Sequence, residues 1–105
     1  MGGVAQGLGQ VMGEGLHYDE QGQLLNASYM DYPMPRSDNI PPMRLAHHEV
    51  PCTTHPLGVK GAGESGVAGA WPAAVSAVLD ALRTQGIEHM DLPFTPDRVW
   101  KALHP

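Results

Sequence analysis

Hydrophobic residues in the first part of the chain recur at the spacing of an α-helix. Within residues 4–16 the apolar positions that share one face are Val4, Leu8, Val11 and Met12. Three glycines interrupt this segment, and each weakens a helix by about 1 kcal/mol relative to alanine. We therefore expect a helix that needs tertiary support, or that uses its glycines for close approach of another element. No capping residue precedes it, so we expect the chain to begin inside a larger structure.

Two further helices are predicted in the C-terminal half. Pro72 suits the first turn of a helix whose apolar face spans residues 75–82, and Gly86 ends it. Residues 95–97 (Thr-Pro-Asp) are typical of an N-cap, a first-turn proline and a first-turn acid. They predict a short helix that carries an apolar face up to Leu103.

The middle of the chain has the signals of extended structure. Residues 15–32 consist of two strand-like runs around the polar turn 19–22, which predicts a β-hairpin. The proline-rich segment 33–42 is expected to be turn and extended chain. Residues 44–50 predict one more strand. The order helix, hairpin, strand, helix, helix indicates an α+β fold.

Composition limits the chain to one domain with a thin core. It has 105 residues, of which 13 are glycine, 10 are proline and only six are aromatic, while 42% are hydrophobic. The hydrophobic content favours folding over disorder. We expect Trp71 and Trp100 to pack the C-terminal helices against a core, part of which lies outside this chain. The composition therefore indicates a piece that packs against something larger.

Charge and cysteine content exclude several classes of protein. The formal net charge is −5 and the six Lys and Arg residues are scattered, which argues against nucleic-acid binding. Cys52 is the only cysteine, so an internal disulfide is impossible and a reducing compartment is favoured. The N-terminal segment lacks the pattern of a signal peptide, and no run of about 18 apolar residues predicts a membrane span.

The segment HHEVPCTTH, residues 47–55, invites a zinc interpretation. Structural zinc sites need four ligands at tight, paired spacing. Neighbouring histidines on an extended chain point to opposite sides, so His47 and His48 rarely serve one ion. Cys52 lacks a nearby cation that would favour its thiolate. We expect surface and strand positions here, and no metal ligand.

The segment GVKGAGESG, residues 58–66, admits three interpretations. As a phosphate-binding loop it would carry Glu64 where the P-loop has its lysine, so this reading fails. As a structural turn it is acceptable, since glycines permit positive φ and an acid before a helix is favoured by the helix dipole. As a catalytic loop it would hold a carboxylate as a general base against a bulky cofactor. Spacing alone does not choose between the last two.

Three strings resemble the C-terminal part of one family. Residues 51–82 (PCTTHPLGVKGAGESGVAGAWPAAVSAVLDAL) are similar to the C-terminal signature of molybdenum hydroxylase large subunits. Residues 2–41 resemble the block QGxGQxxxE…YDxxGQLLNxSxMDYxMPRxxDxP, and residues 90–103 resemble the closing helix. The resemblance is to the xanthine dehydrogenase and aldehyde oxidase superfamily, with the aerobic carbon monoxide dehydrogenases as its closest branch. It implies that residues 1–105 are the C-terminal portion of an incomplete molybdopterin-binding domain.

The resemblance implies an oxidoreductase that uses molybdopterin, in its cytosine dinucleotide form, with molybdenum. Such enzymes hydroxylate an aldehyde or an N-heteroaromatic carbon, or oxidise carbon monoxide, with oxygen from water. Glu64 matches the family's base near the metal, and the chain itself is expected to provide no metal ligand. The residues that the resemblance places near the cofactor are Gln6, Gly7, Lys60, Gly61 and Gly63.

Each of these roles has a plainer alternative. Gln6 can be an exposed helix residue, Lys60 a solvated cation, and the loop glycines can serve turn geometry alone. The chain as a whole can be a non-catalytic remnant or an interaction module that binds a larger subunit. The family resemblance further implies partners: the rest of the large subunit, an FAD-binding medium subunit and a small subunit with [2Fe–2S] clusters, in the bacterial cytoplasm. No turnover is expected from the 105 residues alone.

Overall fold

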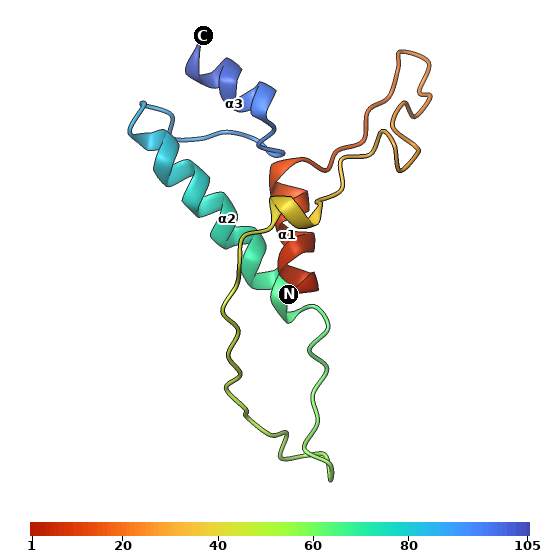
Figure 1. The fold of residues 1–105 in the computed structure, drawn as a ribbon, viewed down its shortest axis with the longest axis vertical. Helices are drawn as coiled ribbons and strands as arrows, with labels where there is room; N and C mark the ends of the chain where they lie inside the picture. The colour runs from red at the N-terminus through yellow and green to blue at the C-terminus, as the bar shows by residue number, and fades with distance from the viewer.

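Three α-helices and two long excursions make up the structure, a computed structural model that describes residues 1–105. The helices are α1 (Gly2–Met12), α2 (Ser65–Arg83) and α3 (Pro96–Leu103), and a single 3-10 turn, η1, covers Ser37–Asn39. Figure 1 shows α1 beside the first half of α2, with one excursion before η1 and a second between η1 and α2. The chain contains no β-sheet, so the α+β prediction is corrected to a helical arrangement.

Helices α1 and α2 pack closely through glycine. A methyl group added at Gly3 would lie 3.0 Å from the Val67 nitrogen, and one added at Gly7 would lie 3.0 Å from Cβ of Ala70. The earlier glycine of α1 meets the earlier part of α2, and the later glycine meets the later part. The two helices therefore run in the same direction, with both N-termini at one end (Figure 1). The glycines of α1 thus serve close approach to another element, one of the two uses predicted from the sequence.

Helix α2 begins seven residues earlier than predicted. It starts at Ser65, so Pro72 lies in its interior and not in its first turn. The proline lacks an N–H and removes one helical hydrogen bond, a local cost that usually ends or kinks a helix. The alanine-rich sequence and the contact with α1 maintain the helix across this point. Pro72 was therefore a misleading start signal.

The predicted hairpin is reduced to one antiparallel bridge between Tyr18 and Leu24. Its turn lies where expected: Gly22 has a φ of +79°, and the Asp19 carboxylate accepts hydrogen bonds from two backbone N–H groups. Beyond the bridge, the Asn26 side chain makes the backbone hydrogen bonds that a paired strand would otherwise make. Its Oδ1 accepts from the His17 N–H at 3.0 Å, and its Nδ2 donates to the Gly15 carbonyl at 2.6 Å. Residues 15–32 therefore do not form the two regular strands of a β-hairpin.

The predicted strand at residues 44–50 is also wrong for this chain. These residues lie in the excursion between η1 and α2, are exposed throughout, and have no β partner. A strand needs a neighbour to receive its backbone hydrogen bonds. Within the 105 residues, no segment lies beside residues 44–50 as a strand partner.

Helix α3 confirms its predicted start. The Thr95 hydroxyl accepts a hydrogen bond from the Arg98 N–H at 3.3 Å, and Pro96 occupies the first turn. Trp100 does not reach the core: its side chain is 59% exposed and stacks on His104. Trp71 is 47% exposed on α2, so neither tryptophan anchors its helix within this chain.

The hydrophobic core is as thin as the composition predicted. Only Val11, Leu82 and Phe94 are buried hydrophobic side chains. The Phe94 N–H donates to the Val11 carbonyl at 2.7 Å, which ties the segment before α3 to the end of α1. This hydrogen bond holds the segment before α3 against α1.

Helix α2 has the length and mean hydropathy, 1.3 over 18 residues, of a helix that could cross a membrane. The prediction from apolar runs did not register it, because alanine, glycine and serine fill much of the helix. The criterion uses length and composition alone, and helices from the cores of soluble proteins also meet it. In this chain α2 contacts α1, and Leu82 is its one buried residue.

Replacing Asn26 with alanine should loosen residues 15–26 in the full-length subunit. The change leaves the His17 N–H and the Gly15 carbonyl without their partner, at a cost of about 2 kcal/mol. Amide hydrogen exchange of this segment should accelerate about 30-fold, as that cost implies. Gln21→Ala, at an exposed turn position, serves as the control and should leave exchange unchanged. Equal exchange in both variants would contradict the bridging role of Asn26.

Candidate functional site

Glu64 occupies the N-cap position of α2. Its backbone has φ −100° and ψ 0°, and its carbonyl accepts a hydrogen bond from the Ala68 N–H at 3.1 Å. Its side chain makes no capping hydrogen bond and is exposed. The helix start thus fixes the backbone of Glu64 while both carboxylate oxygens stay free. The structural-turn interpretation therefore rests on the helix dipole alone, because the carboxylate caps no backbone N–H.

Two of the glycines before Glu64, Gly61 and Gly63, are not required by the geometry of this chain. Gly58 has a φ of +67° and needs glycine, but neither Gly61 nor Gly63 has a positive φ. A methyl group at Gly61 or Gly63 would meet no atom within 4 Å. Their missing side chains instead leave the backbone open to approach from outside the chain.

The same loop carries free hydrogen-bond donors. Among residues 59–64 no backbone N–H donates a hydrogen bond within the chain. Exposed N–H groups before a helix N-terminus favour anionic and oxygen-rich ligands. The loop therefore combines an open backbone, unpaired donors and one free carboxylate.

Gln6 and Gly7 occupy different surroundings on α1. Gln6 is exposed and its side chain makes no hydrogen bond within the chain. Gly7 is buried and packs on Ala70 and Trp71 of α2, so within this chain its role is helix packing. The contact of Gly3 with Gly66 joins the N-terminal ends of the two helices, three residues before Gln6 and two residues after Glu64.

Lys60 is exposed in the same loop and lines an open hollow of about 540 Å³ with residues 48–51 and residues 57–58. It forms no ion pair in the chain. Its ammonium group is therefore available as a solvated cation or as a partner for an external anion.

The His- and Cys-containing segment 47–55 forms no cluster of three or more potential metal ligands. Cys52 donates its N–H to the Gly58 carbonyl at 3.0 Å, which closes the turn before the Glu64 loop. The Thr54 hydroxyl, 3.3 Å from the sulfur, lowers the pKa of the Cys52 thiol. The stretch therefore acts as a local turn that leads into the loop.

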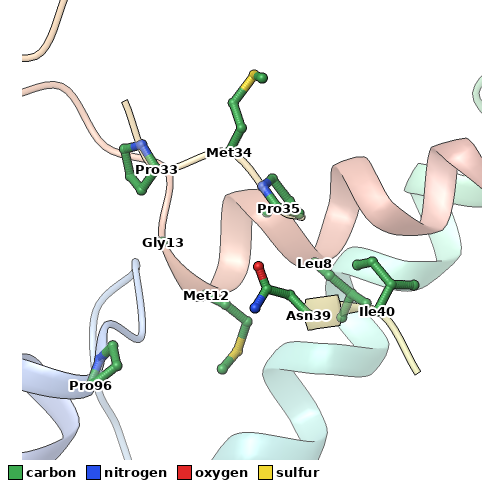
Figure 2. Close-up of a pocket in the computed structure, with 10 residues that line it drawn as sticks. Leu8, Met12, Gly13, Pro33, Met34, Pro35, Asn39, Ile40 and Pro96 are labelled. Carbon is green, nitrogen blue, oxygen red and sulfur yellow. The ribbon is translucent and has the colours of Figure 1, made fainter. Parts of the chain in front are cut away.

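A second hollow lies away from Glu64. It has a volume of about 380 Å³ and lies between α1 and the proline-rich segment, with Pro96 at its edge (Figure 2). In Figure 2 Leu8 and Met12 of α1 lie near Asn39 and Ile40, and Pro33, Met34 and Pro35 pass alongside the helix. The Asn39 amide is its only polar side chain, so this hollow has few groups that could orient a polar ligand.

Gly3 and Gly66 are structural determinants of this region that the sequence motifs do not single out. Their mutual contact joins the two helix ends near Gln6 and Glu64. The available signal was the four-residue spacing of small residues, Gly3 with Gly7 and Gly66 with Ala70. Such spacing allows two helix backbones to approach closely.

Comparison with known proteins gives consistent matches. Residues 1–41 match the molybdopterin cofactor-binding domain family. The chain is 44% identical to the nicotine 6-hydroxylase large subunit of Paenarthrobacter nicotinovorans, over 96% of this chain and 12% of that protein. It is 39% identical to the carbon monoxide dehydrogenase large chain of Hydrogenophaga pseudoflava, over 97% of this chain and 13% of that protein.

A solved structure shows the same fold. Quinoline 2-oxidoreductase from Pseudomonas putida 86 superimposes with a TM-score of 0.88 and 39% identity, over 97% of this chain and 13% of that one. The chain thus spans about an eighth of the length of the relatives that it matches. It corresponds to one segment of their large subunits.

Proposed function

Because the chain belongs to the family of molybdopterin-binding large subunits of molybdenum hydroxylases and aerobic carbon monoxide dehydrogenases, we propose that it serves as part of such a subunit. The proposed enzyme hydroxylates an aldehyde or N-heteroaromatic carbon, or oxidises carbon monoxide, with oxygen from water. The relatives' names include both carbon monoxide and the N-heteroaromatic compound nicotine, and the proposal covers both classes.

The proposal rests on the N-terminal end of the α1–α2 pair, where loop residues 59–64 leave backbone groups uncovered. The loop before α2 offers unpaired N–H groups, Gly61 and Gly63 leave its backbone open, and Gln6 adds an amide from α1. Molybdopterin, in the cytosine dinucleotide form, is rich in phosphate and other oxygen acceptors, so this donor set fits it. Lys60 adds a positive charge from the same loop.

Glu64 is the proposed base. The bound cofactor supplies the molybdenum that accepts the two electrons of the oxidation. Glu64 takes up the proton on one of its carboxylate oxygens, which no hydrogen bond within the chain occupies. The Gln6 amide can donate and accept at once, and it orients an oxygen group beside the carboxylate. Gly7 supports these residues by holding α1 on α2.

The assembled enzyme is proposed to contain more than this chain. The remainder of the large subunit covers the exposed helices, while a medium subunit with FAD and a small subunit with [2Fe–2S] clusters carry electrons away. The relatives are named as large chains or large subunits, which supports a complex of several subunits. We place this complex in the bacterial cytoplasm.

Native mass spectrometry of material from the natural source tests the proposal. We expect the chain's sequence in an assembly with larger polypeptides, with additional mass equal to molybdopterin and its nucleotide. Elemental analysis should find molybdenum close to one atom per assembly. A chain that runs alone and carries neither molybdenum nor pterin would contradict the proposal.

A further inference from the structure

We propose that the contact between Gly3 and Gly66 sets the spacing between the Gln6 amide and the Glu64 carboxylate. Both glycines are then positioning residues for the reaction, and the inference rests on the proposed function. The contact joins the N-terminal ends of α1 and α2, two residues after Glu64 and three residues before Gln6.

The contact is mutual and involves backbone on both sides. A methyl group on Gly3 would lie 3.0 Å from the Val67 nitrogen and 3.2 Å from Cα of Gly66. A methyl group on Gly66 would lie 3.2 Å from the Val4 nitrogen and 3.3 Å from Cα of Gly3. Backbone atoms cannot rotate away as a side chain can, so either methyl group would push the helices apart by a few tenths of an ångström.

The displacement would fall on the functional end of the pair. Glu64 stands two residues before Gly66, and Gln6 follows Gly3 by three residues within one turn of α1. One turn further on, Gly7 and Ala70 form a second contact that a change at Gly66 leaves in place. The helices would therefore separate at the N-terminal end, and the Glu64 carboxylate would move relative to Gln6.

Catalysis is sensitive to such movements. A shift of about 1 Å at a reacting group can lower a rate about 100-fold, so a few tenths of an ångström should lower it about tenfold. The shift does not remove any donor of the loop. The cofactor should therefore still bind while turnover falls.

The test uses the full-length, cofactor-loaded enzyme with Gly66→Ala and, from the other helix, Gly3→Ala. Gly69→Ala is the matched control in α2 and Gly2→Ala in α1, because a methyl group at either position meets no atom within 4 Å. Both test variants should lower kcat about tenfold with unchanged KM and unchanged molybdenum content. The controls should stay within about twofold of the unmodified enzyme.

Thermal unfolding gives a readout that does not depend on activity. Alanine favours helix over glycine, so the controls should keep or raise the melting temperature. Gly66→Ala and Gly3→Ala should lower it, because the helices are forced apart. Equal melting temperatures in test and control variants would overturn the inference.

A double-mutant cycle with Glu64→Asp separates positioning from a general structural role. If Gly66 acts through residue 64, Gly66→Ala should cost less than about threefold in the Glu64→Asp background, against tenfold alone. Multiplying losses, loss of molybdenum in both glycine variants, or failure of both to fold would overturn the inference. Full turnover in Glu64→Gln would instead overturn the proposed function, whatever the glycine variants show.

Discussion

Replacing Glu64 with glutamine is expected to lower turnover of the assembled enzyme about a thousandfold, the range in which a general base contributes. Glutamine has the same length and shape but cannot take up the proton. The side chain makes no hydrogen bond in the chain, so the change breaks no structural contact. The molybdenum content and the melting temperature should therefore remain those of the unmodified enzyme.

The comparison needs a second carboxylate whose loss is harmless. Glu20 lies in the exposed turn between Tyr18 and Leu24, on the excursion that follows α1 (Figure 1). Glu20→Gln removes the same charge and should leave kcat and KM unchanged. Steady-state kinetics and metal analysis on both variants decide the matter. Turnover in Glu64→Gln equal to that in Glu20→Gln would refute the assignment of the base.

The isolated 105-residue chain is expected to unfold without a cooperative transition and to show no turnover. Its accessible surface is 8446 Å², whereas a compact monomer of 11.2 kDa exposes about 5,700 Å². Its radius of gyration is 17.7 Å, against about 13 Å for a compact domain of this length. With three buried hydrophobic side chains, little burial offsets the entropy of ordering the chain.

Calorimetry and circular dichroism measure this directly. We expect a broad loss of helical signal on heating, no sharp heat-absorption peak, and binding of a hydrophobic dye to the exposed side chains. The same segment inside the full-length subunit should unfold with the subunit. A single steep transition of the isolated chain, with matching calorimetric and van't Hoff enthalpies, would show an independent domain.

Local signals predicted the helices better than the strands. Thr95 and Pro96 specify the start of α3 through hydrogen bonding and fixed φ, which act within a few residues. The start of α2 was misplaced because Pro72 gives a start signal that the contact with α1 overrides. The strand predicted at residues 44–50 is absent, because no other segment of the chain lies beside it to receive its backbone hydrogen bonds.

In the candidate site, too, some residues could be predicted from the sequence and others could not. Glu64 and Gln6 are predicted from motifs that resemble a family; the structure places Glu64 at the start of α2 and Gln6 in the middle of α1, both exposed. The contact of Gly3 with Gly66 was not predicted, because a glycine has no side chain whose pattern shows what it faces. Only the helix crossing gives these glycines their role.

The same-direction packing of α1 and α2 also sets an order of assembly. Gly3 and Gly66 meet across about sixty residues, and closing such a loop costs about 4 kcal/mol of chain entropy before any contact rewards it. During synthesis α1 can therefore pack on α2 only after the start of α2 has left the ribosome. The N-terminal end of the helix pair, which begins directly after Glu64, therefore forms only after that closure.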